Sequence, residues 1–162
     1  VCARHLANRE VPTTVVLDRE PTALSGVPGE QLDILGHTDA SVTAEGELPE
    51  PSLVVDALLG YGLRGAPRDR AATLVEWTAS AAAPVLSLDV PSGVDATTGE
   101  RPGVSVRPDL TLTLARPKTG LTGQPGRVVL ADLSIPKAVY EQLSIPVVTP
   151  FGDRFRVSLT AR

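Results

Sequence analysis

The chain has 162 residues and a formal net charge of −4, and this length is enough for one domain with a buried core. An acidic balance disfavours nucleic acid as a partner, because nucleic-acid binding requires a basic face. No run approaches 18 apolar residues and no charged segment precedes an apolar one, so neither a membrane span nor a secretory signal is expected. The single cysteine, Cys2, excludes an intramolecular disulfide, and we expect a cytoplasmic protein.

Taken in chain order, the pattern predicts strands alternating with helices. Apolar side chains at positions 1, 3, 6 and 7 have helical spacing without a capping residue before them, which predicts a sequence that starts inside a helix, with Cys2 as a buried thiol. The stretch 19–29 is predicted to be a loop because it holds two prolines and two glycines. Further strands are expected over 12–18, 41–43, 53–59, 85–89, 109–115 and 127–133, and helices over 31–35, 67–82 and 135–143. This alternation predicts one α/β domain over 1–162, with a mostly parallel sheet in a three-layer sandwich.

Polar groups follow three of these strands. Asp89 stands at the end of the strand over 85–89, and Ser92 follows it beyond Pro91. Ligands bind at the carboxyl ends of strands in open α/β sheets, so a substrate or a cation is expected there. An Asx-type turn that closes a loop is the alternative interpretation of this stretch.

The second strand end carries a carboxylate and a glycine-rich loop. Asp56 lies in an apolar strand, and the loop Gly60-Tyr61-Gly62-Leu63-Arg64-Gly65-Ala66 follows it. Glycines let the backbone approach a ligand, and the helix after them offers N–H groups to phosphate. The glycine spacing differs from the dinucleotide fingerprint, and a flexible loop without a ligand is the alternative.

The third strand end carries Lys118, which can neutralise a phosphate, although most lysines in such loops are simply solvated. Asp56, Asp89 and Ser92 offer hard oxygens without histidine or cysteine. Such a donor set suits an alkali or alkaline-earth cation rather than zinc.

Three ordered motifs, at residues 55–63, 88–99 and 117–121, resemble the NAD(P)H-hydrate epimerase family, the YjeF N-terminal domain. The similarity extends to residues 130–136. The resemblance implies a Rossmann-like fold and an isomerase that interconverts the epimers of hydrated NADH and NADPH, a nicotinamide nucleotide repair reaction. It further implies a functional link to an ADP- or ATP-dependent hydrate dehydratase, with a homodimer among the expected assemblies.

The resemblance also implies roles for individual residues. Asp56 and Ser92 match the family's potassium ligands, so potassium is the expected cofactor. The loop from Gly60 to Ala66, together with Asp89, matches the substrate-binding positions. Asp89 is the expected catalytic residue, and Lys118, in the Pro-Lys-x-Gly-Leu motif, is expected to make a phosphate or polar contact.

The front of the sequence departs from the family pattern. Family members carry an Asn- and Gly-rich loop between a first strand and a first helix, and this sequence begins downstream of both. We therefore expect the first strand and this loop to be missing, and residues 1–162 alone to be poorly soluble or loosely packed, and inactive. A non-catalytic Rossmann-like scaffold or binding module is the alternative function, although a scaffold need not keep Asp56, Asp89 and Ser92 together.

Overall fold

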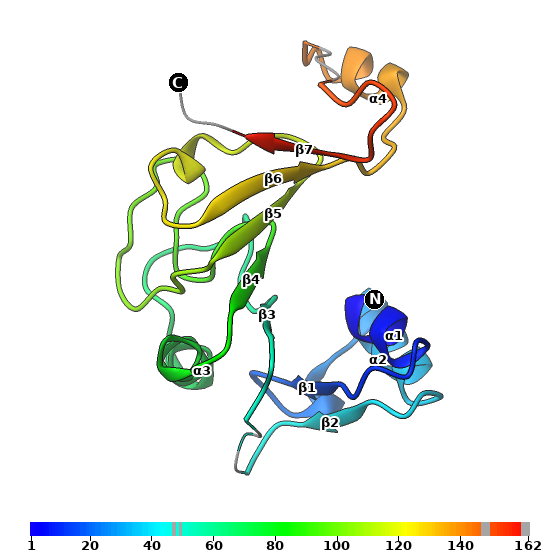
Figure 1. Cartoon of the computed structure of the whole chain (residues 1–162), viewed down its shortest axis with the longest axis vertical. Coiled ribbons are helices and arrows are strands. Elements are labelled where there is room, and N and C mark those ends of the chain that lie inside the picture. Colours follow the sequence, from blue (N-terminus) through cyan, green and yellow to red (C-terminus); the bar gives the residue numbers. More distant parts are fainter. Residues whose placement is uncertain (47, 49, 147–149, 160–162) are drawn as a thin grey trace. The chain divides into compact units, whose positions relative to one another are not determined.

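The computed structural model describes residues 1–46, 48, 50–146 and 150–159. The chain divides into two compact units, Val1–Pro49 and Glu50–Arg162, whose elements are labelled in Figure 1. No helix within the described ranges is long and apolar enough to cross a membrane.

The first unit contains a small parallel sheet and two helices. Its elements are α1 (Cys2–Ala7), β1 (Thr14–Val16), the 3-10 helix η1 (Pro21–Ala23), α2 (Gly26–Leu35) and β2 (Ser41–Thr43). Strands β1 and β2 pair in parallel from Thr14 opposite Ser41 to Val16 opposite Thr43.

Two expectations for this first unit are wrong. Helix α2 begins at Gly26, inside the stretch predicted to be a loop. Its proline, Pro28, lies in the first turn, where the missing N–H would have no partner within the helix. Cys2 is exposed rather than buried, because α1 buries none of its six residues.

The second unit is built on a five-stranded sheet in the order β3-β4-β5-β6-β7. Its strands are β3 (Val54–Asp56), β4 (Val85–Leu88), β5 (Leu110–Leu114), β6 (Arg127–Ala131) and β7 (Arg156–Leu159). The other elements are α3 (Asp69–Ser80), the 3-10 helix η2 (Thr119–Leu121) and α4 (Lys137–Gln142). Strands β3 to β6 are parallel and β7 is antiparallel to β6, so the predicted α/β fold with a mostly parallel sheet is confirmed.

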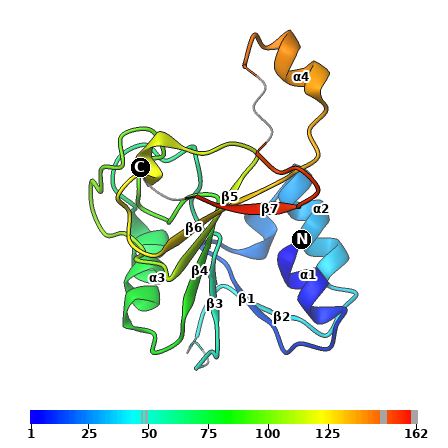
Figure 2. The ribbon, with the colours of Figure 1, turned by 45° about the horizontal axis from the view of Figure 1, so that its top comes forward.

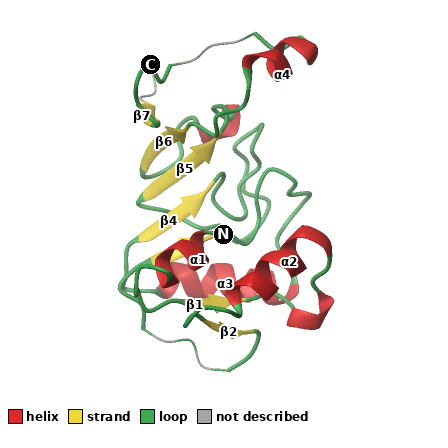
Figure 3. Cartoon of the chain, turned by 90° about the vertical axis from the view of Figure 1, so that its right-hand side faces the viewer, coloured by secondary structure: helices red, strands yellow, loops and turns green. Residues whose placement is uncertain are grey.

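Two apolar clusters hold this unit together. Val75 of α3 packs with Val54, Val85 and Val106, and Figure 2 shows α3 beside the sheet. A second cluster joins the loop after β4 to η2 and consists of Val90, Val94, Ala96 and Leu121. Figure 3 shows the arrowheads of β4, β5 and β6 pointing the same way, so the carboxyl ends of these strands lie at one edge.

Candidate functional site

The three predicted strand ends are neighbours in the sheet of the second unit. Asp56 is the last residue of β3, Asp89 directly follows β4, and Lys118 follows β5 by four residues. Because β3, β4 and β5 are adjacent and parallel, their carboxyl ends meet at one edge. Side chains separated by up to 62 positions in the sequence therefore lie at the same edge of the sheet.

Asp56 is buried, with 3% of its surface exposed, and its carboxylate is surrounded by donors. Oδ2 accepts hydrogen bonds from the Ser87 hydroxyl at 2.7 Å and from the Ser92 backbone N–H at 2.9 Å. Oδ1 accepts the Ser92 hydroxyl at 2.5 Å and the Leu58 N–H at 3.4 Å. These bonds compensate the cost of removing a carboxylate from water.

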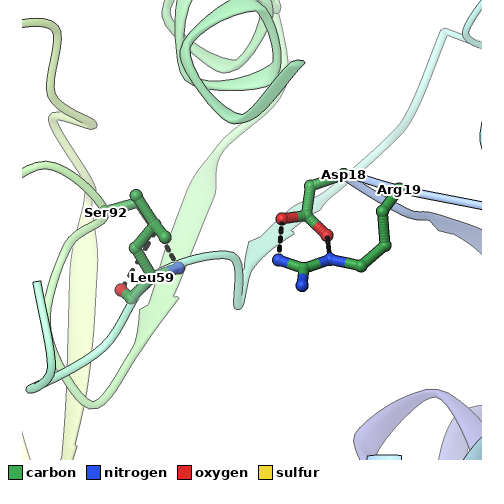
Figure 4. A network of polar contacts seen from close by, with 4 residues as sticks. All are labelled: Asp18, Arg19, Leu59 and Ser92. Carbon is green, nitrogen blue, oxygen red and sulfur yellow. Dashed lines mark hydrogen bonds and ion pairs between the residues drawn. The ribbon is translucent and has the colours of Figure 1, made fainter. Parts of the chain in front are cut away.

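Ser92 lies in a loop that is as buried as the core. Val90, Pro91, Ser92 and Val94 each expose less than 2% of their surface, so the polar groups of this loop need internal partners. The Ser92 hydroxyl also accepts the Leu59 N–H at 2.9 Å and lies 3.3 Å from the Leu59 carbonyl oxygen, as Figure 4 shows.

These contacts gather three kinds of oxygen at one point: the Asp56 carboxylate, the Ser92 hydroxyl and the Leu59 carbonyl. Such a donor set fits a hard alkali or alkaline-earth cation. Among the described residues, no group of three or more histidine, cysteine, aspartate or glutamate side chains could hold a metal ion. A cation at this point would therefore depend on neutral oxygens beside one carboxylate.

A surface ion pair in the first unit is the other contact drawn in Figure 4. Arg19 donates from Nε and Nη2 to the two carboxylate oxygens of Asp18, at 2.8 and 2.6 Å. This hydrogen-bonded contact raises the pKa of the Arg19 guanidinium. The pair is a local feature between neighbours in the sequence.

Asp89 has an unusual backbone conformation at the end of β4. Its φ is +68°, in the left-handed region that residues other than glycine rarely adopt. The Val90 N–H donates to the Leu88 carbonyl at 2.9 Å, so Asp89 is the central residue of a γ-turn with positive φ, a rare and strained turn. Strain of this kind is concentrated at functional sites.

The two carboxylate oxygens of Asp89 face different groups. Oδ1 accepts hydrogen bonds from the Lys118 ammonium and from the Leu114 N–H, the latter at 3.3 Å. Oδ2 faces the glycine loop, since a Cβ built on Gly60 would lie 3.7 Å from it. Within the described part of the chain Oδ2 has no hydrogen-bond partner, and 22% of the Asp89 side chain is exposed.

The loop from Gly60 to Ala66 lies along a cavity of about 510 Å³. The lining consists of Leu58, Leu59, Gly60, Gly62, Leu63, Arg64, Ala66, Pro67, Arg68 and Ala71. Two predicted site residues, Tyr61 and Gly65, do not line it, and Tyr61 is 66% exposed. Lys118 lines a different hollow of about 650 Å³, between the segment around η2 and strands β6 and β7.

Asp95, the second carboxylate of the motif after β4, closes a turn. Its Oδ1 accepts the N–H groups of Thr97 and Thr98 at 2.8 Å each. The bond from Thr98, followed by the bond from Thr97, lowers the pKa of Asp95. The Asx-type turn considered for this stretch thus occurs at Asp95, whereas Asp89 faces the glycine loop.

Sequence reasoning missed several members of this site. Ser87 lies inside the strand predicted over 85–89 and had no predicted role, yet its hydroxyl donates to Asp56. Ser87 and Asp56 meet because the register of β3 and β4 places them opposite each other, and the sequence does not reveal that register. The backbone groups of Leu59 and Leu114 carry no signal at all in the sequence.

The fold is that of an α/β protein in which the predicted site residues stand at the carboxyl ends of a parallel sheet, the edge where open sheets of this class bind ligands. The family model described as "YjeF-related protein N-terminus" matches residues 1–120, and the chain belongs to this family. The match confirms the family resemblance of the sequence motifs.

Individual relatives agree with the family. The chain is 45% identical over 168 residues to a protein of Dehalogenimonas lykanthroporepellens named NAD(P)H-hydrate epimerase, covering 99% of this chain and 67% of that protein. It is 37% identical to the "Bifunctional NAD(P)H-hydrate repair enzyme Nnr" of Hyperthermus butylicus, covering 84% of this chain and 27% of that enzyme. The crystal structure of yeast ynu0 has the same fold, with a TM-score of 0.76, 20% identity, and coverage of 98% of this chain and 70% of the yeast chain.

Proposed function

We propose that this protein is an NAD(P)H-hydrate epimerase, an isomerase that interconverts the two epimers of hydrated NADH and NADPH. Family membership and the 45% identity to a protein of that name support the proposal. The observation that carries it is the carboxylate of Asp89. One oxygen is held by two donors, and the other is directed toward a glycine loop beside a cavity.

The chemistry of the hydrate explains why a carboxylate is needed. Water added to a dihydronicotinamide ring leaves a hydroxyl on the carbon beside the ring nitrogen. Inverting that carbon breaks and reforms either its bond to nitrogen or its bond to oxygen. In the first route a base takes the hydroxyl proton while a carbonyl forms and the ring nitrogen leaves, and the proton returns when the ring closes. In the second route an acid protonates the departing hydroxyl, which leaves as water, and the resulting base takes a proton from the water that adds back. Asp89 Oδ2 is the group that exchanges this proton with the substrate oxygen in either route.

Binding of the dinucleotide is assigned to the segment Gly60, Tyr61, Gly62, Leu63, Arg64, Gly65 and Ala66. Glycine backbone allows close approach, and the Arg64 guanidinium, exposed at the cavity, matches the charge of a phosphate. Lys118 uses two of its three ammonium donors within the chain, on Asp89 and Leu114, and the third can meet a substrate oxygen.

We further propose a potassium ion at the oxygens of Asp56 and Ser92, with the Leu59 carbonyl as a neighbour. The oxygen-only donor set and the contact between Asp56 and Ser92 support this site. When bound, the cation supplies a fixed positive charge for an anionic substrate. Asp56 and Ser92 also hold the buried loop after β4 in place, and because Asp89 directly precedes this loop, they help to position Asp89.

The remaining expectations are proposals of the same kind. The family match covers the first unit and continues through residues 50–120 of the second, which supports a single domain over 1–162. A relative named as a bifunctional repair enzyme supports a link to a second repair step, carried out by an ADP- or ATP-dependent hydrate dehydratase. The homodimer and the cytoplasmic location stay predictions.

A direct assay tests the proposed function. The protein that contains these residues, expressed from its complete reading frame, is incubated with one purified epimer of hydrated NADH, and the second epimer is followed by chromatography. We expect the two epimers to reach equilibrium faster than in buffer. A rate equal to that in buffer for both hydrated NADH and hydrated NADPH would refute the proposal and favour the scaffold alternative.

A further inference from the structure

The strand next to β4 ends in a second strained turn. Ala115, directly after β5, has a φ of +61°, and the Arg116 N–H donates to the Leu114 carbonyl at 2.6 Å. Neighbouring parallel strands thus both end in γ-turns with positive φ, centred on Asp89 and Ala115. Each turn costs about 1–3 kcal/mol and persists only where its surroundings enforce it.

Lys118 is the side chain that joins the two turns. Its ammonium donates to the Leu114 carbonyl at 2.7 Å and to Asp89 Oδ1. The Leu114 N–H donates to the same Oδ1, so Asp89, Leu114 and Lys118 form a closed set of contacts. Only 13% of the Lys118 side chain is exposed, against 71% for Lys137, the other lysine of this chain.

We propose that Lys118 is a positioning residue for Asp89. It fixes Oδ1 against the end of β5, so that Oδ2 is the oxygen presented to the substrate. This inference rests on the proposed role of Asp89 in epimerisation. This role differs from that of a lysine whose main task is to bind phosphate, because the Lys118 ammonium already has two acceptors within the chain.

Kinetics distinguish positioning from substrate binding. We expect Lys118→Met to lower kcat about 10- to 100-fold, because a misplacement of about 1 Å costs that much, and to change KM by a smaller factor, since only one ammonium donor is left for the substrate. Lys118→Arg keeps the charge and should recover part of kcat. Lys137→Met, at an exposed pair with Glu141, should match the wild type. A Lys118→Met variant with raised KM and unchanged kcat would overturn the proposal.

A second measurement reads the contact without activity. In protein labelled with ¹³C and ¹⁵N at lysine, the Lys118 side-chain NMR signal is assigned by its loss in Lys118→Arg. We expect Asp89→Asn to move this signal and to leave the Lys137 signal in place. An unmoved Lys118 signal would overturn the pairing. A shifted signal in a protein without epimerase activity would support the pairing and refute the proposed function, so the two failures are distinguishable.

Discussion

Replacing Asp56 by alanine should destabilise the second unit strongly, because this carboxylate holds the buried loop after β4. Two donors would lose the acceptor that the structure gives them: the Ser87 hydroxyl and the Ser92 backbone N–H, both in residues with 0% exposure. The Ser92 hydroxyl keeps an alternative acceptor in the Leu59 carbonyl at 3.3 Å. The fourth donor, the Leu58 N–H, lies 3.4 Å from Oδ1 in a half-buried residue, so two groups rather than four are left without an acceptor.

Each buried donor without an acceptor costs about 1–3 kcal/mol, so Asp56→Ala should lower the free energy of unfolding by about 2–6 kcal/mol. An ordinary domain has a margin of about 5–15 kcal/mol, so a large share of the stability would be lost. Asp56→Asn keeps one acceptor oxygen and should cost about half as much.

Urea unfolding followed by the fluorescence of Trp77 measures this change. Trp77, the only tryptophan, packs against the cluster of Val54 and Val85, so its signal reports the core beside Asp56. Asp153→Ala, at an exposed turn residue, serves as the control and should leave the midpoint unchanged. A midpoint for Asp56→Ala equal to that of the control would refute the structural role of Asp56.

Three further predictions concern the same unit. Gly93→Ala should cost about 1–3 kcal/mol more than Gly123→Ala in urea unfolding. Both glycines have positive φ, but a Cβ at Gly93 would lie 2.2 Å from the Val104 oxygen, whereas a Cβ at Gly123 meets open space. Equal costs would contradict the packing around Gly93. The pKa of Asp95 is lowered in the folded protein, so its contribution to stability is present above the ordinary aspartate pKa of about 4 and is lost as pH falls through the folded pKa. The stability difference between wild type and Asp95→Asn should therefore shrink on acidification. A difference that grew would count against this turn. Replacing potassium by tetramethylammonium should slow epimerisation, and Ser92→Ala should weaken the response to potassium; a rate indifferent to the cation would contradict the cation site.

The sequence predicted the elements that carry the site better than it predicted their contacts. Helix α3 lies inside the helix predicted over 67–82, and its buried residues are Leu74, Val75 and Thr78. Strand β3 is shorter than the predicted 53–59, because the N–H groups of Leu58 and Leu59 turn away to side-chain acceptors instead of a neighbouring strand. No strand was predicted at the position of β7, and its four residues form a strand by pairing with β6.

The ion pair between Asp89 and Lys118 shows why the rest of the site was not predictable. Both residues were singled out, but separately, as a catalytic group and a phosphate contact. Their contact spans 29 positions and depends on two turns with positive φ at Asp89 and Ala115. Alanine rarely adopts positive φ, and aspartate does so more often than most residues but still in a small minority of cases, so no local signal predicts the turns.

The central claim is that Asp89 is the base of an epimerase, and one comparison tests it most directly. The rate at which a single epimer of hydrated NADH equilibrates is measured for wild type, Asp89→Asn and the exposed control Asp153→Asn. We predict that Asp89→Asn lowers kcat about 10²- to 10⁴-fold, the usual contribution of a positioned base, while the control matches wild type. Wild-type turnover by a folded Asp89→Asn variant would contradict the account.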